Sequence, residues 1–163
     1  MGEDRLPTPS QTVGPFFGFA LPFAAGTDAA DGTAAIRIEG QLLDGSGDPV
    51  PDGLVEIWGG QQFARCRTDA EGAFHFTVTK PLADRDDEAP HLEVMVFARG
   101  LLRQIHTRCY FADDPSLDGD PVLGLVPAER RATLLAHPDP AEHGRWVFDV
   151  RLQGTEETVF FSV

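Results

Sequence analysis

Apolar and polar residues alternate along several short segments, each bounded by residues typical of turns. The alternation is clear over 36–42, which precedes the glycine- and proline-rich segment 44–49, and again over 74–78, where every second residue is apolar. Successive side chains of a strand point to opposite faces of a sheet, so this period predicts half-buried β-strands. The intervening glycines and prolines favour chain reversals.

The same pattern extends to most of the chain. One short helix is expected over 127–135, because Pro127 can occupy the first helical turn, where its missing N–H has no intrahelical role. Seven or eight short strands with a single short helix predict an all-β fold, an antiparallel β-sandwich. The further segments expected to form strands are 54–58, 91–98, 104–111, 146–152 and 158–161.

The first 25 residues do not follow this pattern. They combine four prolines, which exclude a regular helix or a central strand, with an apolar group of phenylalanines. An arm this rich in phenylalanine is unfavourable in water and is expected to pack on the sandwich or on another subunit. The expected division is an irregular N-terminal arm over 1–35 and a sandwich over 36–163.

Composition and charge limit the classes of function. The 163 residues suit one domain, and 13 Lys+Arg against 26 Asp+Glu give a net charge of −13, which argues against nucleic acid as a ligand. Cys66 and Cys109 do not form a metal-binding CxxC pattern and are interpreted as free thiols of a reducing compartment. With an acidic start and no long apolar run, the chain is expected to be soluble and cytoplasmic.

Two places carry candidate chemistry. His91 and Glu93 lie two positions apart on an expected strand and therefore share a face; with His75 or His106 they could form a metal site of two histidines and one carboxylate. The alternative is the solvent-facing side of a strand. Arg99, at the end of that strand, could bind a carboxylate in a cleft or could be a solvated surface arginine.

Several segments together resemble one family, the protocatechuate 3,4-dioxygenases, and within it the alpha subunits. The similarity spans almost the whole chain in order. The segments that carry it are TPSQTVGPFF at 8–17, LVEIW at 54–58, TDAEGAF at 68–74, APHLEVMVFARG at 89–100, HTRCYF at 106–111, and the carboxyl-terminal 145–161.

This resemblance implies a hetero-oligomeric enzyme that cleaves the ring of protocatechuate with O₂ to give 3-carboxy-cis,cis-muconate. Catalytic chains of the family hold a non-haem Fe(III) with two tyrosinates and two histidines, hard ligands that suit ferric iron. Here the only tyrosine is Tyr110, and the expected His-x-His segment is His91-Leu92-Glu93. The resemblance therefore implies that this chain has no catalytic residue and no metal ligand, and that a homologous beta subunit binds the iron.

The family also implies a role for the arm and for Arg99. Thr12, Pro15 and Arg99 match positions that line the substrate pocket, so the arm is expected to pack on the partner subunit and Arg99 to lie near the carboxylate of the substrate. Residues 40–78 also resemble transthyretin-like and carboxypeptidase-regulatory-like domains. This second resemblance implies a binding module without enzymatic role.

Overall fold

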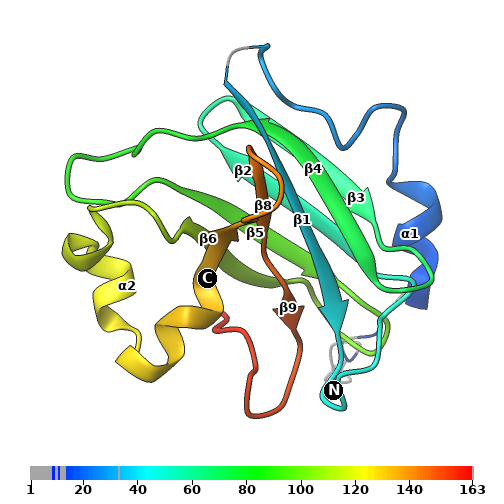
Figure 1. Cartoon of the computed structure of the whole chain (residues 1–163). Helices are drawn as coiled ribbons and strands as arrows, with labels where there is room; N and C mark the ends of the chain where they lie inside the picture. The colour runs from blue at the N-terminus through cyan, green and yellow to red at the C-terminus, as the bar shows by residue number, and fades with distance from the viewer. Residues whose placement is uncertain (1–8, 10, 12–13, 33, 163) are drawn as a thin grey trace, which may run out of the picture.

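A computed structural model describes residues 9, 11, 14–32 and 34–162 of the chain (Figure 1). Two short α-helices, α1 (Phe17–Ala20) and α2 (Pro121–Leu125), lie on opposite sides of the strands in this view, and three 3-10 helices cover Gly14–Phe16, Leu117–Gly119 and Ala128–Leu134. The strands are β1 (Ala35–Leu43), β2 (Leu54–Gly59), β3 (Gln62–Arg67), β4 (Ala73–Thr79), β5 (His91–Phe97), β6 (Ile105–Phe111), β7 (Leu135–Pro138), β8 (Arg145–Val147) and β9 (Val150–Arg151).

These strands form a single curled sheet in the order β3-β2-β5-β6-β7-β8-β1-β4, with β9 beside β1. In Figure 1, β1 and β4 cross over the layer that contains β2, β5 and β6, so the sheet is nearly closed on itself. The all-β class is confirmed, but the pairing is mixed, because β6–β7, β1–β8 and β1–β9 are parallel. Parallel pairing of β6 and β7 follows from the long connection through α2, which returns the chain in its original direction.

The N-terminal arm joins the two ends of this sheet. The Arg65 N–H of β3 donates to the Gly26 carbonyl at 2.6 Å, and the Thr77 N–H of β4 donates to the Thr27 carbonyl at 2.8 Å. Directly between the end strands, Gln62 exchanges two side-chain hydrogen bonds with the backbone of Thr79 at 2.7 and 2.8 Å. The described part of the arm therefore lies on its own chain along β3 and β4.

Several expected elements differ in detail. The helix expected over 127–135 is a 3-10 helix that ends at Leu134 and leads straight into β7. The strand expected over 146–152 is divided into β8 and β9. The segment 158–161 contributes only an isolated bridge, between Phe161 and His106. Strand β3 and the helices α1 and α2 were not expected from the sequence, which predicted one short helix and none in the first 25 residues; α1 is a single turn that fits between Pro15 and Pro22.

The interruption between β8 and β9 has a local cause in β1. The Phe148 carbonyl points at Gly40, where an added Cβ would lie 1.7 Å from its oxygen, and the Phe148 N–H donates to the Glu39 carbonyl at 2.8 Å. The ladder with β1 is therefore interrupted at this point, but its register is the same on both sides, because Ile38 pairs with Trp146 and Leu42 pairs with Val150. Only glycine at position 40 allows so close an approach.

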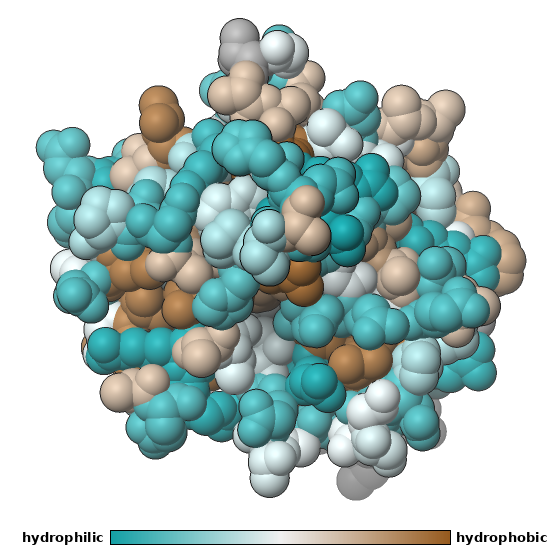
Figure 2. All heavy atoms as spheres, in the orientation of Figure 1, coloured by the Kyte–Doolittle hydropathy of each residue, from teal (hydrophilic) through white to brown (hydrophobic). Residues whose placement is uncertain are grey.

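The core lies between the two layers of the curled sheet. Phe74, Phe76 and Val78 are at most 3% exposed, which confirms the face predicted from their alternation. The face in Figure 2 is mainly hydrophilic, with apolar atoms in separate smaller areas. In the described ranges, no helix has the length and apolar character needed to cross a bilayer.

Candidate functional site

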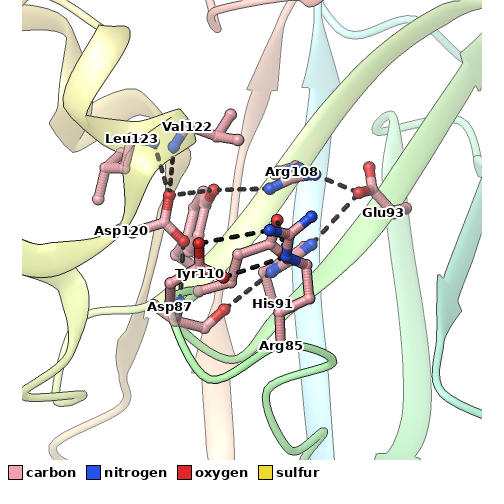
Figure 3. Close-up of polar contacts among 11 residues, drawn as sticks. Arg85, Asp87, His91, Glu93, Arg108, Tyr110, Asp120, Val122 and Leu123 are labelled. Atoms are coloured by element: carbon pink, nitrogen blue, oxygen red, sulfur yellow. Dashed lines mark hydrogen bonds and ion pairs between the residues drawn. The ribbon is translucent and has the colours of Figure 1, made fainter.

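Polar side chains gather on one face of the antiparallel pair β5–β6, close to α2 (Figure 3). His91 stands opposite Tyr110 and Glu93 opposite Arg108, while His106 is the next same-face residue of β6. Because alternate residues of a strand share a face, the register brings all five side chains together. The predicted common face of His91 and Glu93 is confirmed.

Glu93 is the centre of this cluster. Its carboxylate contacts His91 Nε2 at 3.2 Å, His106 Nε2 at 2.9 Å and Arg108 Nε at 3.0 Å. The sequence left His75 and His106 as alternatives for a third ligand, and the structure brings His106 here, whereas His75 pairs across the sheet with Glu39 of β1. Both carboxylate oxygens therefore already face nitrogen atoms of the same chain.

Tyr110 is held in a second set of contacts. Arg108 Nη1 donates to the phenol oxygen at 3.2 Å, and the phenol O–H donates to Asp120 Oδ1 at 3.2 Å. Asp120 is 2% exposed and caps α2, where it accepts from the N–H groups of Val122 and Leu123 at 2.9 and 2.7 Å. Tyr110 thus fastens α2 to the sheet.

Burial and charge set the protonation of these groups. Burial raises the pKa of Tyr110 to about 12, so its phenol keeps its proton at neutral pH. Burial alone would lower the pKa of His91, but hydrogen bonds to Glu93 and to the Ala89 carbonyl outweigh it and the pKa is raised. For Glu93, burial is outweighed by the His91 hydrogen bond and the Arg108 charge, and its pKa is lowered. The cluster therefore favours an anionic Glu93 beside the Arg108 guanidinium.

This arrangement does not fit the iron that the family resemblance implies. In the part of the chain that the structure describes, no three His, Cys, Asp or Glu side chains are grouped as a metal site. The guanidinium of Arg108 lies between Glu93 and Tyr110, where it bonds to both. A metal cation bound to Glu93 would compete with this guanidinium and with two imidazoles.

Arg99 lies away from this cluster, just after β5. Its Nε donates to Asp52 Oδ2 at 2.6 Å, and its Nη2 contacts the same oxygen. The Arg99 side chain is 68% exposed, whereas that of Asp52 is 9% exposed. Asp52 was not singled out from the sequence. The turn sequence Pro-Asp-Gly at 51–53 was a signal for its position, but no local pattern could indicate a partner 47 positions away.

The arm approaches the segment that carries Arg99. The ring of Phe17 packs on Phe97, with centroids 5.9 Å apart, and a cavity of about 200 Å³ lies between the arm and the β5–β6 connection. Pro15 belongs to the 3-10 helix Gly14–Phe16, and Thr12 lies outside the described residues. The cavity is lined by Gln11, Phe17, Phe97, Ala98, Leu101, Leu102, Arg103 and Gln104.

Known proteins resemble the chain over nearly its full length, although no family model matches it. The protocatechuate 3,4-dioxygenase alpha chain of Burkholderia cepacia is 42% identical, over 96% of this chain and 97% of the relative. The beta chain of the same enzyme and organism is 28% identical, over 76% and 66%. The solved intradiol ring-cleavage dioxygenase of Tetranychus urticae superposes with a TM-score of 0.65 at 11% identity, over 81% of this chain and 89% of the neighbour.

The structural match assigns the architecture, a mainly β fold with few helices, to the intradiol dioxygenases. The sequence match then decides the type of chain. The protein belongs to the family of protocatechuate 3,4-dioxygenase alpha chains. It is therefore a dioxygenase subunit, and the alternative of a transthyretin-like binding module is not favoured.

Proposed function

We propose that this chain is the non-catalytic alpha subunit of a protocatechuate 3,4-dioxygenase and that a homologous beta subunit binds the non-haem Fe(III). The complex would convert protocatechuate and O₂ to 3-carboxy-cis,cis-muconate, with both oxygen atoms entering the product. The observation that carries the proposal is the occupation of Glu93 by Arg108, His91 and His106. The iron site of catalytic chains needs two tyrosinates, whereas this chain has one tyrosine, Tyr110. Its phenol is already hydrogen-bonded to Arg108 and Asp120.

The partner is proposed from two lines of support. In Burkholderia cepacia, one relative is named an alpha chain and another a beta chain of the same enzyme, which is the basis for a hetero-oligomer. In addition, Phe16, Phe19 and Phe23 of the arm are 66%, 67% and 51% exposed. Aromatic side chains exposed this far are typical of surfaces that another chain covers. The arm over 1–35 is therefore proposed to pack on the beta subunit through this aromatic face, while its other side lies on β3 and β4 of its own chain.

In the same proposal, Thr12, Pro15 and Arg99 help to complete the substrate pocket of the partner. Support comes from the contact between Phe17 of the arm and Phe97, which draws the arm toward the segment of Arg99. An exposed guanidinium on a chain with a net charge of −13 is a place where a carboxylate such as that of protocatechuate can bind. The cytoplasm remains the proposed location.

Reconstitution tests the proposal. The chain purified alone should neither turn over protocatechuate nor show a tyrosinate-to-iron charge-transfer band, and co-expression with a beta subunit should give a coloured, active complex. A complex that lacks residues 1–16 should lose activity, because the arm no longer reaches the pocket. If the chain alone is coloured and active, the alpha-type assignment of its role is wrong.

A further inference from the structure

We propose that Asp52 is a positioning residue that fixes the guanidinium of Arg99 for recognition of the substrate carboxylate. This inference rests on the proposed pocket role of Arg99. Asp52 lies in the turn before β2. Its side chain is nearly buried, whereas that of Arg99 beside it is largely exposed. The pair joins that turn to the end of β5.

The turn that carries Asp52 is held firmly on the sheet. Thr68 makes three hydrogen bonds to this turn. The Thr68 hydroxyl accepts from the Gly53 N–H at 2.9 Å and donates to the Val50 carbonyl at 2.6 Å. The Thr68 N–H donates to the Gly53 carbonyl at 3.0 Å. Thr68 is 3% exposed. A carboxylate mounted on such a turn is a fixed acceptor, so its position does not depend on the substrate.

The Arg99 side chain, in contrast, is not fixed by burial. It lies in a turn completed by Gly100, with a φ of +88°, and its side chain is 68% exposed. Asp52 contacts its Nε and Nη2 atoms through one carboxylate oxygen. In the described part of the chain, Nη1 makes no hydrogen bond, which leaves one edge of the guanidinium to a second acceptor.

The arm lies on the same turn. A Cβ at Gly18 of α1 would stand 3.7 Å from the Asp52 carbonyl oxygen and 3.4 Å from Nε of Arg67. Asp52 is thus situated where the arm, the turn and the end of β5 meet. A guanidinium held at this junction by one edge can present its other edge to a carboxylate. Because its side chain is already ordered, binding costs less conformational entropy.

The geometry predicts a specific kinetic change. Replacing Asp52 by Asn keeps the size of the side chain but removes the charge that orients Arg99. In the complex with the beta subunit, Asp52→Asn should raise the KM for protocatechuate about tenfold, with kcat changed less than about twofold, because a binding contact common to ground and transition states is weakened. The KM for catechol, which lacks the carboxylate, should stay unchanged.

Matched variants separate this inference from the proposed function on which it rests. Asp48→Asn makes the same charge change at an exposed site and should leave both KM values unchanged. Arg99→Ala should raise the KM for protocatechuate at least as much as Asp52→Asn, and the double variant should be no worse than Arg99→Ala alone. If Arg99→Ala has no effect, the pocket role of Arg99 itself is wrong.

Three results would overturn the role of Asp52 while leaving that of Arg99 intact. The first is an Asp52→Asn complex with an unchanged or lower KM for protocatechuate. The second is an Asp52→Asn complex in which the KM for catechol rises as much as the KM for protocatechuate. Should Asp52→Asn fail to assemble, Arg99→Lys provides the test, because an ammonium cannot bond to Asp52 through one edge and to the substrate through another. Arg99→Lys with the wild-type KM is the third.

Discussion

The ion cluster around Glu93 allows a quantitative test through Arg108→Met. Methionine keeps much of the apolar volume of the arginine stem but removes the guanidinium, which leaves the carboxylate with the two imidazoles alone. The side chains of Arg108 and Glu93 are 17% and 30% exposed. Breaking a fully buried pair costs about 3–5 kcal/mol and an exposed pair at most about 1 kcal/mol, so for this intermediate burial we expect a loss of about 2 kcal/mol.

Urea unfolding of the chain, followed by fluorescence of Trp58 and Trp146, measures this loss as a lower midpoint at an unchanged slope. The charge-neutral double variant Glu93→Gln with Arg108→Met should be less destabilised than the sum of the two single variants, because the unpaired charge is gone. Arg85→Met provides the control, since that side chain is 67% exposed. A loss of stability no larger than that of the control, together with additive effects of the single and double variants, would show that the Arg108–Glu93 ion pair does not stabilise the fold.

Other predictions concern protonation, thiols and packing. The raised pKa of His91 means that its contribution to stability is complete below the unfolded value of about 6.5 and is lost as pH rises through the higher folded value. The stability difference between wild type and His91→Gln, measured by urea titration, should therefore shrink as pH rises above about 6.5. A constant difference would contradict it. Burial raises the pKa of both Cys66 and Cys109, so a thiol reagent at pH 8 should modify them slowly in the native chain and quickly in urea; fast native labelling of Cys109 would be the contrary result. Gly40→Ala should destabilise the chain by about 3 kcal/mol or more, as seen by thermal unfolding, because its Cβ collides with the Phe148 carbonyl, and a neutral effect would show that the two strands can separate there.

The parts of the fold that follow from local patterns were predictable. The strand over 73–79 shows a clean period of two, and its burial alternates accordingly. Strand β3 lacks this signal, because only Ala64 and Cys66 point inward and the arginines Arg65 and Arg67 instead stack on arm phenylalanines. These contacts depend on an arm that lies about 40 residues earlier in the chain, which no local pattern encodes.

The candidate site divides in the same way. The common face of His91 and Glu93 follows from their spacing, since two residues on a strand always return to one side. The capture of Glu93 by Arg108 depends on the register of β5 with β6, which the sequence does not state. The pairing of Arg99 with Asp52 depends on how β2 and β5 lie side by side, so it became visible only in the folded chain.

In the proposed complex, the iron lies outside this chain. A crystal structure of the complex with its beta subunit, using anomalous scattering on both sides of the iron absorption edge, would locate the metal. We expect one strong iron peak for each alpha–beta pair, surrounded by side chains of the beta subunit. No peak should lie near Glu93, where the Arg108 guanidinium should appear instead. An iron peak coordinated by His91, Glu93 or Tyr110 would contradict the proposed location of the metal.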